Sequence, residues 1–309
     1  MSSTTGTLSQ LMQNYYDRLF VDTAKETLIH EQGAQKRPLP AGQGKVVYFQ
    51  RYTPLSIITA QIGESSNPTA VNLSATNVSS TVSEFGSYTK ISKLLKLTAV
   101  DSKMKGAVEV MAQNAGESRD QLVRDHALVG KGTTQLAGGK SALTDVAVSN
   151  TLSSSELRKA VRTLKANKAM KYEDGFFMAK IGPYSSYDMQ GDSTWVNAHS
   201  YKDGSELYKG EIGKIYGVRV VETTNPKETA DGGASNADIQ HSFVHSKNSF
   251  GITDLEGDGK KVYVKTPGAN STDNPVDRFY TVGWAMGMVP VRLVSEWIIE
   301  IKHGATDKS

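Results

Sequence analysis

The sequence predicts an α+β protein with a protruding arm, and three observations support this prediction. A segment from Thr53 to Lys90 is rich in Ser, Thr and Asn, and its only aromatic residues are Phe85 and Tyr88. Strand-like runs flank this segment, with Lys45–Tyr52 before it and Thr81–Tyr88 at its far end. A long amphipathic helix follows directly, and the rest of the chain alternates short strands with helices.

The polar segment is too long to be an ordinary loop. Structureless stretches of this length are uncommon inside a compact domain. The strand-like runs at its ends favour an extended two-stranded arm that leaves its own subunit. A lone hairpin is only marginally stable in water, so such an arm needs a surface that something else supplies. This feature indicates a protein that assembles rather than a self-contained enzyme.

Composition narrows the class further. The chain has 309 residues, enough for two lobes, and its net charge of +3 is too small to indicate a dedicated nucleic-acid binder. It has no cysteine, which excludes disulfides, thiolate catalysis and iron–sulfur clusters. No apolar run reaches the ~18 residues of a membrane span, and the N-terminus has no secretory pattern. We therefore expect a soluble protein that is cytoplasmic when synthesised.

Apolar spacing predicts two helices in the first half of the chain. Leu8 to His30 has one apolar stripe and ends before Gly33. Leu97 to Val129 keeps one apolar face over about nine turns, or roughly 50 Å. Gly130-Lys-Gly132 should end this second helix. A single stripe over such a length predicts a strut that lies across other elements.

A second lobe is predicted from Leu136 onward. Ser153 and Glu156 have the spacing of a capping box, which predicts a helix with Leu157, Ala160, Val161 and Leu164 on its buried face. A polar helical stretch is predicted at Tyr184–Ala198. The predicted strands are Phe176–Ile181, Gly213–Glu222, His241–His245, Lys261–Lys265, Phe279–Met288 and Arg292–Ile301. Pro290 should separate the last two strands, and the final strand should return to the strut helix.

None of these catalytic or metal-binding motifs is complete in the sequence. His241 and His245 are four residues apart, but Ser242 stands where a zinc protease has its glutamate base. Asp254 opens a calcium-like pattern whose twelfth position is Lys265 instead of Glu. No Gly-x-Ser-x-Gly elbow is present. We therefore assign no catalytic residue, no metal site and no cofactor.

The helix after Ser153 carries a run of basic residues. Arg158, Lys159, Arg162, Lys165, Lys168 and Lys171 follow Glu156 without an intervening acidic residue. Arg158, Arg162 and Lys165 are the candidates to face a polyanion, where each neutralised phosphate adds salt-dependent affinity. The alternative is a solvated face or a salt-bridged subunit contact, which the small net charge favours.

The order of these elements resembles a tailed-bacteriophage major capsid protein of the Hong Kong 97-type fold, in particular the podophage and prophage coat families. The similarity spans nearly the whole chain, although each motif is short. The matching stretches are Tyr15–Leu19, Lys36–Pro40, Gly44–Phe49, Arg51–Tyr52, Phe85–Tyr88, Ile181–Pro183, Asp188, Trp195, Tyr208–Gly213, Gly217–Thr223 and Val282–Trp284.

The resemblance implies a division of the chain into five parts. They are an N-terminal arm (1–45), an extended loop with its strands (46–92), the spine helix of a peripheral domain (93–135), an axial domain (136–275) and the return strands of the peripheral domain (276–309). The extended loop would reach over a neighbouring subunit. Residues expected at contacts between subunits are Arg51, Leu55, Ile57, Ile58, Ile62, Glu64, Val71 and Phe85.

The resemblance also implies a function. The chain would assemble through hexamers and pentamers into an icosahedral shell around double-stranded DNA, within the host cytoplasm. Its partners would be copies of itself, a portal, a separate scaffold or decoration protein, and the packaged DNA by non-specific contact, with no membrane. An encapsulin-like cargo compartment is the alternative with the same fold. A β-rich hydrolase or metal enzyme is the alternative from another class.

Overall fold

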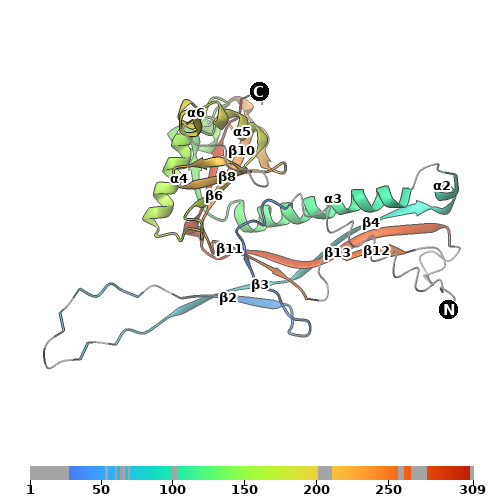
Figure 1. Ribbon diagram of the computed structural model, residues 1–309, viewed down its shortest axis with the longest axis horizontal. Coiled ribbons are helices and arrows are strands. Elements are labelled where there is room, and N and C mark those ends of the chain that lie inside the picture. The colour runs from blue at the N-terminus through green and yellow to red at the C-terminus, as the bar shows by residue number, and fades with distance from the viewer. Residues whose placement is uncertain are drawn as a thin grey trace.

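The computed structural model shows a compact lobe and a long lobe, with a narrow ribbon leaving the body where they meet (Figure 1). The predicted helix Leu8–His30 lies almost wholly outside the described residues, and its last residues, from Leu28, are not helical. The structure describes residues 28–52, 55–59, 61–62, 64, 67–68, 70–98, 103–200, 211–256, 261–265 and 277–306.

The long lobe is a five-stranded sheet covered by a long helix. Helix α3 (Lys103–Val123) runs along the sheet (Figure 1), and α2 (Lys93–Thr98) lies at its far end. The central strand is β13, which pairs along one edge with β4 and along the other with β12 and β11. The strands are β1 (Gln35–Lys36), β4 (Ser83–Ser92), β11 (Phe250–Asp254), β12 (Lys261–Lys265) and β13 (Phe279–Arg292).

The predicted strut is present. Helix α3 continues into a π-helical turn, η1 (Arg124–Leu128), and Gly130 ends it with a φ of 62°. Val108 and Ala112 are fully buried on its inner face, where they belong to one core with Met286 of β13. The apolar periodicity therefore identified the packed face correctly.

The predicted pairing of the arm was wrong in one respect. Of the run Thr81–Tyr88, Thr81 pairs with the strand that precedes the polar segment, whereas Ser83–Tyr88 do not. Instead β4 pairs with β13 over ten residues, from Phe279–Ser92 to Met288–Ser83. This pairing places β4 beneath α3, where Ile91 is buried in the core of the long lobe.

Proline did not divide the late β-run as expected. Strand β13 continues through Pro290 to Arg292. Pairing with β4 ends at Met288, so β13 has a strand neighbour on only one side at Pro290. A residue without an N–H donor is tolerated at such an edge position.

The compact lobe is built on a seven-stranded sheet in the order β5-β14-β10-β6-β8-β7, with β9 also paired to β10. Helix α4 (Ser154–Ala166) buries the predicted stripe Leu157, Ala160, Val161 and Leu164. Helices α5 (Pro183–Gln190) and α6 (Ser193–Ser200) complete the lobe. The strands are β5 (Thr133–Leu136), β6 (Phe177–Ile181), β7 (Glu211–Ile215), β8 (Val218–Glu222), β9 (Lys227–Thr229), β10 (Ile239–His245) and β14 (Ile298–His303).

Two local predictions in this lobe were wrong. The run Gly213–Glu222 is a hairpin of β7 and β8, because Tyr216 and Gly217 take φ angles of 50° and 83° and reverse the chain. The capping box is not formed. The carboxylate of Glu156 instead accepts a hydrogen bond from Gln135 Nε2 at 2.8 Å, while the Ser153 hydroxyl lies 2.9 Å from that of Ser155.

The strands also cross the boundaries expected from the sequence. Strand β14, predicted among the return strands 276–309, pairs with β10 in the compact lobe. Strands β11 and β12, predicted within 136–275, pair with β13 in the long lobe. Alternation along one strand shows which side chains share a face, but it does not specify which strand will pair with it.

Candidate assembly interface

The ribbon that leaves the body is a two-stranded sheet. Strand β2 (Val46–Tyr52) pairs with β3 (Ala75–Thr81) over seven residues, from Val46–Thr81 to Tyr52–Ala75. Val47 and Phe49 are buried in a small core shared with Leu39. The intervening Tyr48 points away and is 57% exposed. The base of the ribbon is therefore fixed to the body by alternate side chains, while its other face lies open.

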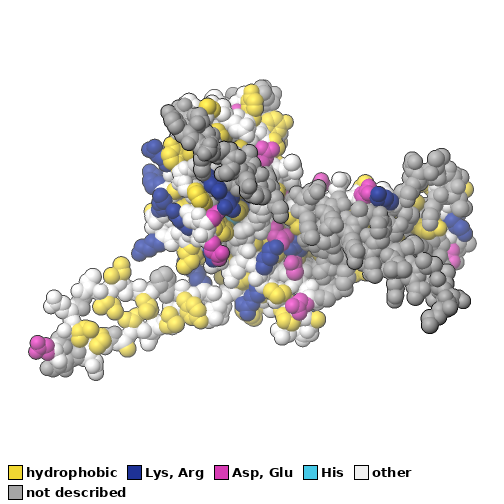
Figure 2. All heavy atoms as spheres, viewed as in Figure 1, with side chains coloured by type: hydrophobic (Ala, Val, Ile, Leu, Met, Phe, Trp, Pro, Cys, Tyr) yellow, Lys and Arg dark blue, Asp and Glu magenta, His cyan; other side chains and the backbone are white. Residues whose placement is uncertain are grey.

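Beyond this base the ribbon carries unburied apolar side chains, seen as yellow atoms in Figure 2. Ile57 is 81% exposed, an unusual position for so large an apolar side chain. Exposed apolar residues in this segment are Leu55, Ile57, Ile58, Ile62, Val71 and Leu73. Five of these were predicted contact residues, and Leu73 was missed although it continues the same series. Exposed large apolar side chains that gather on one projecting segment indicate an interaction site.

The other three predicted contact residues lie in different settings. Glu64 is exposed in the same loop. Arg51 places its guanidinium carbon 5.7 Å from the centre of the Trp297 ring of its own chain. Phe85 lies opposite Met286 on β13 and packs, half-buried, against the core of the long lobe. Phe85 therefore belongs to the interior packing of the subunit rather than to the arm.

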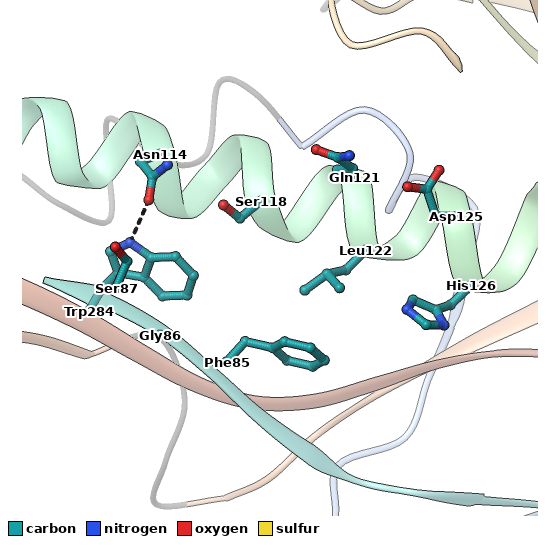
Figure 3. Close-up of a pocket in the computed structure, with 10 residues that line it drawn as sticks. All are labelled: Phe85, Gly86, Ser87, Asn114, Ser118, Gln121, Leu122, Asp125, His126 and Trp284. Atoms are coloured by element: carbon teal, nitrogen blue, oxygen red, sulfur yellow. Dashed lines mark hydrogen bonds between the residues drawn. The ribbon is translucent and has the colours of Figure 1, made fainter. Parts of the chain in front are cut away.

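Figure 3 shows a pocket between α3 and the sheet beneath it. Its volume is about 450 Å³, and Asn114 Oδ1 accepts a hydrogen bond from Trp284 Nε1 at 3.0 Å within it. The helix supplies mostly polar side chains, whereas Phe85 and Trp284 form an aromatic side. The pocket is lined by Phe85, Gly86, Ser87, Asn114, Ser118, Gln121, Leu122, Asp125, His126 and Trp284.

The two histidines of the incomplete metal motif have partners on neighbouring elements. His241 Nδ1 lies 2.7 Å from Glu300 Oε1, and its Nε2 lies 2.8 Å from Thr229 Oγ1. His245 Nδ1 lies 2.8 Å from the Tyr172 hydroxyl. Burial raises the pKa of Glu300, but its hydrogen bond and ion pair with His241 outweigh burial and hold that pKa below the usual value. These contacts connect β9, β10 and β14.

Neither a metal site nor a membrane-spanning element emerges from the described part of the chain. No three His, Asp or Glu side chains among these residues are grouped closely enough to hold a metal ion. Within the same residues, every helix is too short or too polar to cross a bilayer.

The basic residues of α4 form one exposed face of the compact lobe, visible as dark blue atoms along its edge in Figure 2. Arg158, Arg162 and Lys165 are all exposed. Lys159 forms an ion pair with Glu156 at 2.7 Å, and the guanidinium carbon of Arg158 lies 6.0 Å from the centre of the Tyr216 ring. The structure therefore brings the three predicted residues together on one face.

Comparison with solved structures shows the fold. The chain is similar to a chain of the Ralstonia phage GP4 capsid, with a TM-score of 0.71 and 11% identity, over 92% of this chain and 91% of that one. It is also similar to a chain of the cyanophage Pam1 capsid, with a TM-score of 0.65 and 15% identity, over 91% and 93% of the two chains.

A third similar structure is the head of Helicobacter pylori bacteriophage KHP40, with a TM-score of 0.59 and 11% identity, over 89% of this chain and 88% of that one. No protein-family model and no curated protein matches the sequence. The chain thus has the fold of phage capsid chains along nearly all of its length, which confirms the predicted fold class.

Proposed function

We propose that this chain is the major coat protein of a tailed phage and that it assembles into an icosahedral shell around double-stranded DNA. The observation that carries the proposal is a ribbon of exposed apolar residues on a fold shared with phage capsid chains. Burying one isoleucine of this ribbon stabilises a contact by about 1.5–3 kcal/mol. Copies of the same chain supply the burial, since the ribbon projects away from its own body (Figure 1).

In this proposal the two lobes have different places in the shell. The compact lobe is the axial domain around the centre of each hexamer or pentamer, and the long lobe with α3 as its spine is the peripheral domain. The ribbon lies on the next subunit, where Ile57 and Ile58 pack against it. Repeating this head-to-tail contact closes a ring, because each rotation brings the same two surfaces together.

Further partners follow from the same proposal. A portal occupies one vertex, and a separate scaffold or decoration protein joins the shell. Assembly takes place in the bacterial cytoplasm, and the finished protein resides in the virion.

The basic face of α4 is proposed to contact packaged DNA without sequence preference. Reversing two charges, as Arg162→Glu with Lys165→Glu, should remove about two phosphate contacts and make the negative slope of log K against log salt less steep by roughly 1.8. Fluorescence anisotropy with a short duplex at several salt concentrations measures this slope. Lys90→Glu with Lys105→Glu, on exposed positions of the long lobe, gives the same change in net charge and should leave the slope nearly unchanged.

Two results would contradict DNA contact by the basic face of α4. If both pairs of reversals make the slope less steep by the same amount, binding depends on net charge alone, and the α4 face is not a specific site of DNA contact. If neither pair makes it less steep, the face does not contact DNA. Neither outcome changes the proposal of a shell, because assembly rests on the ribbon.

The shell itself is tested by particle mass. The purified chain, expressed without other phage proteins or with a scaffold, should sediment as particles of megadalton mass. A small oligomer of fixed size under both conditions would support an ordinary soluble protein instead. No observation on this chain favours a cargo compartment or a hydrolase.

A further inference from the structure

The turn at residues 30–33 is held in a buried site between the two lobes. We call residues 28–36 the strap. Lys180 lies near the end of β6 with its side chain almost fully buried, and its Nζ donates hydrogen bonds to the carbonyls of His30 at 2.7 Å and Gln32 at 2.8 Å. The same nitrogen lies 4.8 Å from the centre of the Phe250 ring. The compact lobe thus grips the strap through a lysine whose hydrogen-bond acceptors are main-chain carbonyls.

The long lobe holds the same turn through charged side chains of α3. Asp120 accepts a hydrogen bond from the His30 amide at 2.6 Å, and its other oxygen lies 2.6 Å from His30 Nδ1. Arg119 binds Glu31 at 2.7 Å and Asp254 of β11 at 2.7 and 3.0 Å. The strap is therefore hydrogen-bonded to both lobes at once.

Gly33 shows how closely the strap fits the buried site that holds it, which we call the seat. Its φ is 81°, and a Cβ at this position would collide with the Tyr172 hydroxyl and lie 2.9 Å from the His245 ring. That hydroxyl is 3.0 Å from the Gly33 carbonyl and 2.8 Å from His245 Nδ1. Two buried imidazole nitrogens, Nε2 of His30 and Nε2 of His245, have no hydrogen-bond partner. The seat is thus a closed, polar and incompletely satisfied site.

We propose that the strap is a latch between the lobes that opens as the solution becomes more acidic. When the strap is bound in this site, it connects β6 and β10 of the compact lobe to α3 and β11 of the long lobe. Released, it leaves the lobes joined by apolar contacts at their junction, where Phe243 and Ile298 meet Leu128 in one core, and by hydrogen bonds from Arg124 to the loop at Asn225 and Pro226. The apolar contacts are non-directional, so fewer directional contacts then fix the angle between the lobes.

The ionisable groups around the seat favour opening of the latch at lower pH. Burial lowers the pKa of Lys180 to about 7, against an ordinary value of 10.5. Burial also lowers the pKa of His30 and of His245. The groups that face the seat are His30 and Glu31 of the strap, Arg119 and Asp120 of α3, Arg124 of η1, Tyr172, Lys180 of β6, His245 of β10 and Asp254 of β11.

Each of these lowered pKa values favours release of the strap as the pH falls. Between pH 10.5 and 7 the released state binds one more proton at Lys180, so opening is favoured by about tenfold for each unit that the pH falls. Below pH 6.5 the two histidines add to this effect. Ion pairs with Arg119 and Lys36 outweigh burial and hold the pKa of Glu31 at about 2, so its stabilisation is lost only as the pH falls from 4.5 towards 2.

Hydrogen exchange on the full-length subunit tests the latch. From pH 9 to pH 7, protection of the strap amides, corrected for intrinsic exchange rates, should fall about 100-fold relative to the amides of α4. Lys180→Met keeps the volume of the side chain and removes its charge, so this fall should nearly vanish. Lys165→Met, on the exposed face of α4, should behave as the natural protein.

Two results would overturn the latch. One is strap protection that follows the α4 amides over the whole pH range in the natural protein, a result that needs no variant to fold. The other is a pH response that survives in Lys180→Met. The latch is a property of the single subunit, so its failure leaves the proposed shell untouched, and a protein that forms no shell can still show it.

Discussion

Replacing residues 53–74 by an Asn-Gly turn should leave a folded subunit that forms no shells. Tyr52 and Ala75 are paired across β2 and β3, so a two-residue turn closes the hairpin at that point. The apolar side chains removed from this segment are exposed, and therefore the subunit loses little packing. Thermal unfolding should shift by no more than a few degrees, while sedimentation should show only small species.

A finer pair of variants separates the apolar contacts from the length of the loop. Ile57→Ser with Ile58→Ser keeps the loop and removes two of its most exposed apolar groups, and shell yield should fall at least tenfold. Ser56→Ala with Thr59→Ala changes exposed polar neighbours and should assemble as the natural protein. Normal shells from the shortened chain would show that the ribbon has no part in assembly.

Arg119→Met should be the most destabilising single change at the junction of the lobes. It leaves the Glu31 carboxylate, whose side chain is only 8% exposed, without its buried partner. Removing one member of such a pair costs about 3–5 kcal/mol. Urea unfolding followed by circular dichroism measures the loss. Lys105→Met breaks an exposed pair with Glu109 and should cost less than about 1 kcal/mol.

A second change distinguishes the buried charge from lost packing. Adding Glu31→Gln to Arg119→Met removes the buried carboxylate, whose remaining ion pair is with the exposed Lys36, so part of the lost stability should return. In the natural protein, the low pKa of Glu31 contributes stability above pH 4.5 that is lost as the pH falls towards 2. The Arg119→Met protein should show a smaller loss, because only Lys36 then opposes the effect of burial on the pKa of Glu31. Equal costs for Arg119→Met and Lys105→Met would contradict the role of the network.

The features that depend on one segment were predictable from the sequence. The periodicity of α3 and of α4 identified their buried faces, and the polar segment with its flanking strands identified the ribbon. The exposed positions Leu55, Ile57, Ile58, Ile62 and Val71 followed from the same segment. In each case the chain itself contains the period or the composition that decides the outcome.

The features that depend on distant segments were not predictable. Alternation shows which side chains share a face, but not that β4 pairs with β13 or that β14 joins β10. Phe85 was assigned to the arm because it lies within the polar segment, whereas its partner Met286 is about 200 residues away in the chain. Lys180 has one signal in the sequence, a lone charge among Phe177, Met178, Ala179 and Ile181.

The junction network was missed for the same reason. Glu31, Arg119 and Asp254 are ordinary surface residues by type, and nothing local indicates that they meet. The burial of Glu31 and Arg119 follows from the position of the strap between two sheets whose strands come from separate parts of the chain. The sequence could indicate such a network only if the segments that lie next to each charged residue in the folded chain were already known.

Electron microscopy of the purified natural protein tests the central claim most directly, that the ribbon is buried only by other copies of the same chain. We expect closed, isometric shells of uniform diameter under conditions that favour association. The contrary result is a compact single chain under those conditions, with the amides of residues 55–73 as protected from exchange as those of α4. That outcome would mean that the subunit covers its own ribbon, and the proposed shell would have no basis.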